Sequence, residues 1–530
     1  MTSRPLGKQS MPRPGPGSRP WRSRAARRGG AILASAALLV LAACSGGASE
    51  QSTDDGTSAG GGTVTVGATL EPTSLDLTSV SGAAIPQVLL YNVYETLVKI
   101  DPSSGELAPL LAQDWEVSDD GLTYTFNLVP DATFHDGQPL LASDVVWSLE
   151  RVRDPDAANP FAAQMDVVDT IEAPDESTVV VTLSQPSNRW LFDMASQTGV
   201  ILKEGATDLE TSANGTGPFT FENWNRGSDI TLAQAPEYWG EPASLDEVVF
   251  TYITDPNALN NAMLSGQLDV LSNVQAPQLL ETFQSTEEFE VVEGQTTGEV
   301  VLGMNNAAAP LDDVRVRRAI RHAINKPALL DTVWSGYGEL IGSMVPPSDP
   351  WYEDLTGTFE YDPERAQQLL DAAGYGPGDI TLRMPVPPPG YARSAAPFIV
   401  SALEEVGITV EQDNIEMPQW LDSVFNQADY DLTIISHVEP RDIVQYGNPD
   451  YYWNYDDEQT QNLLASADQA TDDAERNRLY QQVARRISDQ AVSDWLFVLP
   501  NLQVIRDGVQ GFPADAYTLS FDMTGVELAS

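Results

Sequence analysis

The sequence predicts an α/β protein with two or three lobes, and three observations support this fold class. Helical and extended patterns alternate between residues 361 and 436, which is typical of a parallel sheet covered by helices. Between residues 124 and 183, apolar residues at every second position predict strands on either side of a helix. About 485 residues remain once an expected export segment is removed, which is more than a single domain usually holds.

Residues 1–43 are typical of an export signal peptide. A cationic leader runs from Met1 to Arg28, and an apolar segment follows from Ala31 to Ala43. That segment is too short for a bilayer-spanning helix, which needs about 20 residues. The stretch Leu41–Cys44 resembles a bacterial lipobox, which implies cleavage before Cys44 and lipid on that residue. The alternative is a buried free cysteine that follows the signal peptide by chance.

The segment after the expected cleavage site lacks the features of a folded element. Residues 44–62 are rich in Gly, Ser and other polar residues, so we expect a lipidated, flexible tether with a reach of roughly 5–6 Å × √n for n residues. Cys44 is the only cysteine in the chain. The exported protein can therefore form no intrachain disulfide, and its fold must rest on its core.

Ordered structure is expected to begin near Thr63, where the run TVTVGA favours a strand. Two further strands are predicted around residues 124–128 and 179–183, where apolar residues alternate with polar ones. Ser143 is placed to cap a helix between these two strands. The apolar stripe of this helix consists of Val145, Val146, Leu149 and Val152.

In the carboxyl-terminal half, the best-defined helix lies between Asp362 and Gly374. Asp362 is a suitable N-cap, Pro363 fits the first turn, and Gly374 ends the helix. The other elements predicted here are helix 313–324, strand 380–386, helix 395–406, strand 408–410, helix 420–425, strand 431–436 and a long helix after Thr471.

Charge excludes one class of function. Residues 1–43 hold eight of the chain's 28 Lys and Arg residues and no acidic residue, which leaves 20 basic side chains against 77 acidic ones. Nucleic-acid binding requires cationic patches that face phosphates, so we expect no nucleic-acid partner.

The sequence offers little that could perform catalysis. It contains no Walker loop, no HExxH motif and no GxGxxG motif. Its three histidines, His135, His322 and His437, lie in separate regions, and no pair has metal-ligand spacing. We therefore expect no enzyme activity, no metal site and no cofactor. His437 directly follows the strand predicted at 431–436, and the carboxyl ends of strands in α/β sheets face the ligand crevice.

The run Tyr451–Tyr455 contains four aromatic residues in five positions. Two interpretations remain open for it. Such residues can form part of the core, or they can offer rings and hydroxyl groups to a ligand in a cleft.

Several longer motifs lie between about Thr63 and the end of the chain. They are Tyr94–Val98, GELAPLLAQDWEVSDDGLTYTFNL (105–128), ATFHDGQPLLASDVVWSLERV (132–152), Gly215–Phe219 with Asn223-Trp224, PEYWGEPASLDEVVF (236–250), Met304–Asn306, DVRVRRAIRHAI (313–324), YDPERAQQLLDAAGY (361–375) and the region from Tyr452 to Pro500. Together these motifs resemble one family, the solute-binding proteins of peptide- and nickel-type ABC importers, and the resemblance covers about Thr63 to the end of the chain.

The resemblance implies a type II clamshell of two lobes that close over a solute, with an additional α+β domain inserted into the first lobe. On this basis lobe I would comprise residues 63–97, 215–299 and 496–530. The inserted domain would comprise residues 98–214, and lobe II would comprise residues 300–495. Closure of the lobes on a ligand, followed by docking on a permease, is what the family implies.

The resemblance also implies where ligand contacts lie. Many peptide-binding members carry a Trp-x-x-Asp segment after the strand that ends here near Ser436, and its Asp pairs with the ammonium of the peptide. This chain has His437 at the Trp position and either Glu439 or Asp442 as the acid, with Arg441 beside them. The remaining candidate ligand contacts are Thr78, Ser79, Val80, Asn305, Trp420 and Trp453.

The function implied is therefore solute capture for an ABC importer, with permease and ATPase subunits as partners. The expected protein is a monomer, anchored through Cys44 at the extracytoplasmic face of a bacterial membrane. A short peptide is the expected ligand. An oligosaccharide or a nickel or other metal chelate is the alternative, because the aromatic residues near Tyr452 could stack on sugars and His437 could contact a chelated metal.

Overall fold

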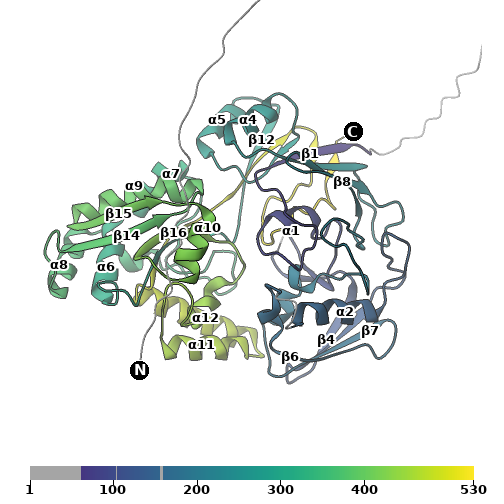
Figure 1. The fold of residues 1–530 in the computed structure, drawn as a ribbon, viewed down its shortest axis with the longest axis horizontal. Coiled ribbons are helices and arrows are strands. Elements are labelled where there is room, and N and C mark those ends of the chain that lie inside the picture. The colour runs from purple at the N-terminus through teal and green to yellow at the C-terminus, as the bar shows by residue number, and fades with distance from the viewer. Residues whose placement is uncertain (1–60, 103, 155–158, 530) are drawn as a thin grey trace, which may run out of the picture. The chain divides into compact units, whose positions relative to one another are not determined.

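The computed structural model describes residues 61–102, 104–154 and 159–529 (Figure 1). The predicted signal peptide at 1–43, Cys44 and the predicted tether up to residue 60 lie outside the described residues. Within the described ranges, no helix is both long and apolar enough to cross a membrane.

Seven strands form the largest sheet of the described chain, in the order β12-β18-β11-β1-β10-β9-β8. The strand predicted at Thr63 is β1, which runs parallel to β10 and β11 while the other pairs are antiparallel. Val64 and Val66 of β1 are fully buried beside their register partners Val248 and Phe250. The elements of this part are β1 (Thr63–Ala68), α1 (Ala84–Leu89), β8 (Phe219–Asn225), β9 (Asp229–Gln234), β10 (Glu247–Tyr252), α4 (Pro256–Leu264), β11 (Val270–Leu271), α5 (Leu280–Gln284), β12 (Phe289–Gly294), β18 (Asn501–Arg506), β19 (Val509–Gln510) and β20 (Glu527–Leu528).

A separate four-stranded antiparallel sheet, β4-β5-β7-β6, lies between β1 and β8 in the sequence and packs against α2. Strands β5 and β7 confirm the alternating patterns. The cap expected at Ser143 is wrong, because α2 begins at Ala142 after Leu141, whose N–H donates to the Asp144 carboxylate at 2.9 Å. The elements here are β2 (Val98–Ile100), β3 (Leu107–Pro109), β4 (Ala112–Val117), β5 (Thr123–Leu128), α2 (Ala142–Arg153), β6 (Val168–Glu172), β7 (Thr178–Leu183) and α3 (Trp190–Asp193).

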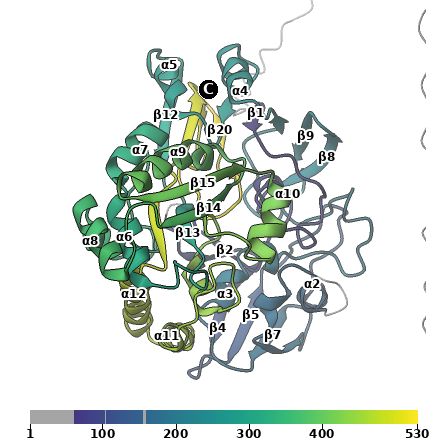
Figure 2. The same ribbon diagram turned by 60° about the vertical axis from the view of Figure 1, so that its left-hand side comes forward.

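The third part contains the antiparallel sheet β16-β13-β17 and the parallel pair β14-β15, with α9 packed against β15 and α6 against α8 (Figure 2). Its elements are β13 (Glu299–Met304), α6 (Val314–Ala323), α7 (Lys326–Trp334), α8 (Pro363–Ala373), β14 (Ile380–Val386), α9 (Gly390–Glu405), β15 (Ile408–Asn414), α10 (Met417–Trp420), β16 (Leu432–His437), α11 (Glu458–Asp468), α12 (Asp473–Asp489) and β17 (Ser493–Val498).

Helix α8 confirms its predicted boundaries in detail. The Asp362 carboxylate accepts the N–H of Arg365 at 2.8 Å, and Gly374 ends the helix in the left-handed region at φ 98°. Helix α9 begins five residues earlier than predicted, at Gly390. The helix predicted at 420–425 is instead the short α10 followed by a π-helical turn at Leu421–Asn426.

The parallel sheet expected over residues 361–436 is only partly correct. β14 and β15 pair in parallel, but β16 pairs with β13 in antiparallel fashion and forms no regular ladder with β14. Pro385 of β14 has no N–H to donate, and its carbonyl accepts instead from the Thr433 hydroxyl at 2.9 Å. The Thr433 side chain thus takes the place of a backbone hydrogen bond at the edge of β14, where a third parallel strand would otherwise pair.

Two chain crossings join the seven-stranded and three-stranded sheets: β12 leads into β13, and β17 leads into β18. The crossings lie side by side, since the Leu499 N–H donates to the Gly298 carbonyl at 2.8 Å and the Thr296 hydroxyl to the Leu499 carbonyl at 2.5 Å. This is the two-lobed α/β clamshell with an inserted α+β domain that the sequence predicts. The residue boundaries predicted for the lobes stay predictions, because the described residues belong to one compact unit.

Candidate functional site

The predicted site begins where β16 ends, at His437. The Nδ1 atom of His437 lies 3.0 Å from Oδ2 of Asp442, and its Nε2 atom lies 2.9 Å from the Tyr452 hydroxyl. All three side chains are buried. Because an ionised carboxylate only accepts hydrogen bonds, Nδ1 donates to Asp442, and Nε2 of a neutral ring then accepts from Tyr452. Both ring nitrogens of His437 are thus occupied within the protein.

Three further carboxyl groups surround this pair, from Glu299, Asp349 and Glu439. Burial raises the pKa of Glu299 well above its usual value, and the charges of Asp442, Asp349 and Glu439 add to this rise. Burial raises the pKa of Asp349 to about 7, although the charge of Arg441 opposes it. Glu439 retains solvent-exposed surface, yet desolvation by the surrounding protein and the charge of Asp442 raise its pKa. These acids therefore share one partly closed, poorly hydrated space.

Arg441 supplies a fixed positive charge beside these acids. Its backbone lies in the left-handed region at φ 64°. Its guanidinium lies 3.7 Å from the ring centre of Phe192 in α3 and 5.2 Å from that of Trp351. Burial lowers the pKa of Arg441, and the charge of Asp349 counteracts this. Arg441 therefore links the third part of the chain to the inserted domain through a cation–π contact.

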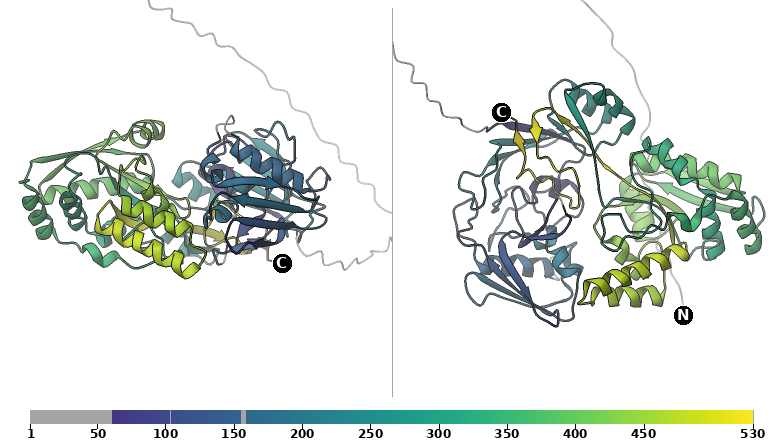
Figure 3. Two further views of the ribbon diagram at one scale, coloured as in Figure 1. Left: turned by 90° about the horizontal axis from the view of Figure 1, so that it is seen from below. Right: turned by 180° about the vertical axis from the view of Figure 1, so that it is seen from behind.

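A second contact joins the same two parts next to Arg441. The Asn188 side-chain amide lies 2.5–3.0 Å from the carbonyls of Ala467, Asp468 and Ala470, at the carboxyl end of α11. The Ser187 hydroxyl donates to the Asp468 carboxylate at 2.9 Å. In Figure 3 the helices α11 and α12 correspondingly approach the four-stranded sheet. The carboxyl end of α11 thus touches the segment before α3 at this edge.

The aromatic run divides between core and site. Trp453 is fully buried and stacks on Tyr446 at 4.2 Å between ring centres, while Tyr452 binds His437. Tyr451 is only half-buried and meets Phe425 at 5.5 Å, and Phe425 is 39% exposed. The core interpretation therefore applies to Trp453, whereas contact between a ligand and the accessible rings stays a prediction.

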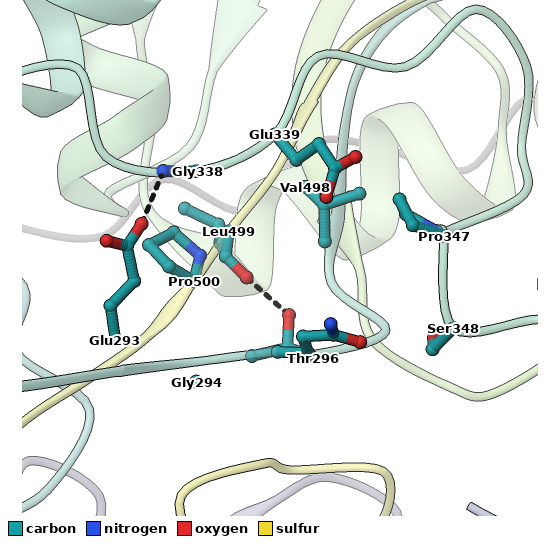
Figure 4. A pocket seen from close by; sticks show the side chains of 11 residues that line it. Glu293, Gly294, Thr296, Gly338, Glu339, Pro347, Ser348, Val498, Leu499 and Pro500 are labelled. Carbon is teal, nitrogen blue, oxygen red and sulfur yellow. Dashed lines mark hydrogen bonds between the residues drawn. The ribbon is translucent and has the colours of Figure 1, made fainter. Parts of the chain in front are cut away.

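A cavity of about 250 Å³ lies at the two chain crossings (Figure 4). Ser348, which lines it, directly precedes Asp349, and Val498 is the β17 register partner of Glu299. The cavity therefore lies beside the backbone neighbours of Asp349 and Glu299, although neither of these two residues lines it. Its lining residues are Glu293, Gly294, Gln295, Thr296, Gly338, Glu339, Pro347, Ser348, Val498, Leu499 and Pro500.

The candidates from lobe I are placed differently. Thr78 is buried, and its hydroxyl is held by the Asp76 carboxylate and the Arg151 guanidinium. Ser79 is exposed, with its hydroxyl on the Asp76 carbonyl at 3.1 Å, and Val80 is half-buried. Ser79 and Val80 thus offer accessible surface, whereas Thr78 fixes the turn.

Asn305 and Trp420 are engaged inside the protein. The Asn305 amide donates to the carbonyls of Ala428 and Tyr430, and its oxygen accepts from Asn454. The Trp420 indole donates to the Thr433 hydroxyl at 2.9 Å. Asn305 follows the far end of β13, roughly 20 Å along the strand from Glu299 at about 3.3 Å per residue.

The structure therefore brings together His437, Glu439, Arg441, Asp442 and Trp453 among the predicted residues. Three neighbours of this group are not among the residues predicted from the sequence, namely Glu299, Asp349 and Phe192. A glutamate at the start of the apolar run EVVLGM (299–304) was the available signal for the first of these. Among the residues that the structure describes, no group of three or more His, Cys, Asp and Glu side chains is arranged to hold a metal ion.

Comparisons with known sequences give a consistent result. The model of the bacterial extracellular solute-binding proteins, family 5, matches residues 106–463. The chain is 27% identical to the di/tripeptide-binding protein 2 of Pseudomonas aeruginosa, over 75% of this chain and 82% of that protein. It is 26% identical to the probable D,D-dipeptide-binding periplasmic protein of Escherichia coli, over 85% of this chain and 91% of that protein. Putative ABC transporter peptide-binding proteins of Brucella are 28% identical, over 64% of this chain and 66% of their length, just under two thirds.

Solved structures share the fold. The PBP AgaA of A. tumefaciens R10 in complex with agropinic acid superposes with a TM-score of 0.77 at 26% identity, over 88% of this chain and 99% of that chain. The protein DppA of Helicobacter pylori in complex with the peptide STSA superposes with a TM-score of 0.78 at 24% identity, over 89% of this chain and 98% of that chain. The protein NikA of Brucella suis in complex with Fe(III)-EDTA superposes with a TM-score of 0.78 at 20% identity, over 88% of this chain and 99% of that chain.

Proposed function

Because the chain belongs to family 5 of the bacterial extracellular solute-binding proteins, we propose that it is the substrate-binding component of an ABC importer and captures a short peptide between its lobes. The observation that carries the proposal is the group of carboxyl side chains around His437, next to the contact between the lobes. Peptides are bound through backbone hydrogen bonds and terminal charges, and a buried carboxylate requires a cation.

The terminal ammonium of the peptide pairs with Glu439 or Asp442. His437 already donates to Asp442, and no ion pair within the described chain involves Glu439. Glu439 also keeps exposed surface. Of the two acids, Glu439 is therefore the primary contact and Asp442 the secondary one.

Other predicted residues are retained as proposed contacts with different roles. Ser79 and Val80 offer surface from lobe I, while Thr78 orients them through its bond to Asp76. Arg441 holds the lobes together over the ligand. The residues His437, Asn305, Trp420 and Trp453 act by holding the walls of the cleft.

A non-peptide solute is the second candidate. The half-buried Tyr451 and the exposed Phe425 offer ring faces that suit an oligosaccharide or another small organic molecule. A metal chelate is less well supported, since both nitrogens of His437 are engaged by Asp442 and Tyr452.

The proposed cellular setting follows the sequence. Residues 1–43 direct export, Cys44 carries lipid, and residues 44–62 tether a monomer to the extracytoplasmic face of the membrane. Lobe I is assigned to residues 63–97, 215–299 and 496–530, the inserted domain to 98–214 and lobe II to 300–495. A ligand that favours the closed form drives closure, and the closed form docks on a permease with its ATPase subunits.

A ligand screen tests the proposal. Native mass spectrometry identifies any molecule carried through purification, and thermal-shift measurements then compare di- to pentapeptides, oligosaccharides and nickel–histidine complexes. A ligand at 100 times its Kd adds about 2.7 kcal/mol to the free energy of unfolding. Peptides are expected to raise the Tm, and Glu439→Gln is expected to weaken their binding more than tenfold. A rise with a saccharide and with no peptide contradicts the peptide assignment.

A further inference from the structure

Glu299 has no role in the function proposed above, yet its environment is unusual. It is the first residue of β13 and lies in register with His437 of β16 and Val498 of β17. Its side chain is 2% exposed, and its Oε2 atom is buried without any hydrogen-bond partner. An unpartnered buried polar atom costs about 1–3 kcal/mol, and more when it is charged. The buried, unpartnered Oε2 atom of Glu299 therefore lowers the stability of the ligand-free protein.

Asp494, Asp144 and Glu95 are deeply buried acids with a cation or a hydrogen-bond donor beside them, although Oδ2 of Asp494, like Oδ2 of Asp349, also has no hydrogen-bond partner. Asp494 lies 3.2 Å from Arg321 and 3.1 Å from Lys326. Asp144 lies 3.0 Å from Lys203. Even Glu95, which has no ion pair, accepts hydrogen bonds from Tyr238 and Trp239. Glu299 has neither a cation nor, on Oε2, a donor.

The groups that face Glu299 come from every element packed around it. They are Asp442 and Tyr446 from the 3₁₀ helix Asp442–Gly447, Asp349 from the loop before α8, Glu439 from the loop after β16, and His437 from β16. Arg441 faces Asp349, and His437 binds Asp442. Two carboxyl groups, those of Glu299 and Glu439, remain without a cation.

The cavity at the two chain crossings is lined by acidic residues, which would attract a cationic group. Its lining includes the carboxyl side chains of Glu293 and Glu339 and contains no Lys or Arg (Figure 4). The hydroxyl of Ser348, also in the lining, is buried without a hydrogen-bond partner. A volume of about 250 Å³ accommodates one long side chain.

We propose that Glu299 pairs with a second cationic group of the ligand, so that the cleft selects short peptides with a basic side chain. This inference rests on the proposed function: Glu439 takes the terminal ammonium, and Glu299 takes a lysine-type ammonium or an arginine-type guanidinium that enters from the cavity at the chain crossings. The two cationic groups of such a peptide then compensate the two carboxyl groups that the protein leaves unpaired, one each.

Proton release accompanies this step. Burial and neighbouring carboxylates favour the protonated form of Glu299 in the empty cleft, whereas a bound cation favours the carboxylate. Binding of a basic peptide therefore expels a proton to solvent, and its affinity rises with pH. An uncharged side chain of the same length brings neither effect.

Matched peptides test the inference on the purified protein by calorimetry. Ala-Lys-Ala and Lys-Ala-Ala are compared with the same peptides carrying norleucine, which keeps the carbon chain of lysine without its ammonium. The wild type is expected to bind at least one lysine peptide ten or more times tighter, with proton release that appears when two buffers of different ionisation enthalpy are compared. Glu299→Gln should reduce the preference below twofold and abolish the extra proton release that the lysine peptide shows over its norleucine counterpart.

The controls separate this inference from the proposed function. Glu290→Gln removes an exposed acid from β12 and should leave the preference intact. Glu299→Gln should keep or raise the Tm of the empty protein, because it removes an unpaired buried acid. Equal binding of lysine and norleucine peptides, or a preference that survives in Glu299→Gln, overturns the inference while leaving peptide binding intact.

If no peptide binds, peptide transport is wrong, and cadaverine becomes the deciding probe. Stabilisation of the wild type but not of Glu299→Gln by this diamine supports the cationic site alone. If cadaverine does not raise the Tm of the wild type, the proposed site for a cation at Glu299 is wrong.

Discussion

Buried carboxyl groups show how individual residues divide between scaffold and site. Asp494 and Asp144 have cationic partners within the protein, whereas Glu299 has none. The sequence pointed to His437 because it follows the end of a strand, and the family resemblance pointed to Asp442. The apolar run after Glu299 was a signal of its burial, but no such signal marks Asp349 among the 77 acidic residues of the chain.

Glu95 leads to a prediction about pH and stability. It is 1% exposed, and the Tyr238 hydroxyl and the Trp239 indole donate to its carboxylate at 2.6 and 3.1 Å. Burial nevertheless raises its pKa from 4.5 to about 7 in the folded protein. Between these values the folded state holds a proton that the unfolded state has lost. Raising the pH from 4.5 to 7 therefore lowers the free energy of unfolding, by roughly 3 kcal/mol at 1.36 kcal/mol per pKa unit.

Urea unfolding of the wild type and Glu95→Gln between pH 4.5 and 8 measures this contribution. The variant should lose this part of the pH dependence, because Gln cannot ionise. Glu247→Gln, a change at a half-exposed acid of β10, should retain the wild-type slope. Parallel curves for the wild type and Glu95→Gln would show that Glu95 stays ionised when folded.

At the scale of single elements, prediction worked where local chemistry decides. Helix α8 follows its caps at Asp362 and Gly374, and β5 follows its alternating pattern. Prediction from the sequence failed where contacts with residues from another part of the chain determine where an element begins or which strand it pairs with. α2 begins at Ala142, because the buried Asp144 binds back to Leu141 and is held by Lys203. The parallel sheet stops at β14 because Pro385 faces β16.

The N-cap of α8 gives a prediction at this scale. Asp362→Ala removes the acceptor for the Arg365 N–H and should lower the free energy of unfolding by about 1 kcal/mol. Asp371→Ala, at an exposed position within the same helix, is the matched control and should change it by less than about 0.5 kcal/mol. Urea midpoints measure both. Equal effects would mean that the loss at Asp362 reflects charge rather than capping.

At the scale of the whole described chain, the sequence alone could not specify the sheet pairing. β1 pairs with β10 in a register that joins Thr63 to Glu247, and β18 near the end of the chain returns to the same sheet. Such partners are separated by hundreds of residues, and no local pattern encodes them. The family resemblance supplied the lobes, but the contact between Arg441 and Phe192 became evident only from the structure.

That contact between the lobes also determines how closure responds to mutation. Asn188 lies at the carboxyl end of α11, where its amide reaches the carbonyls of Ala467, Asp468 and Ala470. These bonds join α11 to the segment before α3, so we expect them to favour the form in which these two parts touch. Asn188→Ala should shift the population toward the open form and weaken ligand binding by up to about tenfold, since one hydrogen bond contributes roughly 1 kcal/mol.

Small-angle scattering of the ligand-free protein should show a larger radius of gyration for Asn188→Ala than for the wild type. Asn462→Ala, at an exposed position of α11, is the matched control and should change neither the radius nor the affinity. Because α11 is otherwise untouched, the Tm of both variants should remain within a few degrees of the wild type. A radius that is unchanged in Asn188→Ala, together with unchanged affinity, would mean that the remaining contacts, such as Ser187 with Asp468 and Arg441 with Phe192, hold these two parts together without the Asn188 side chain.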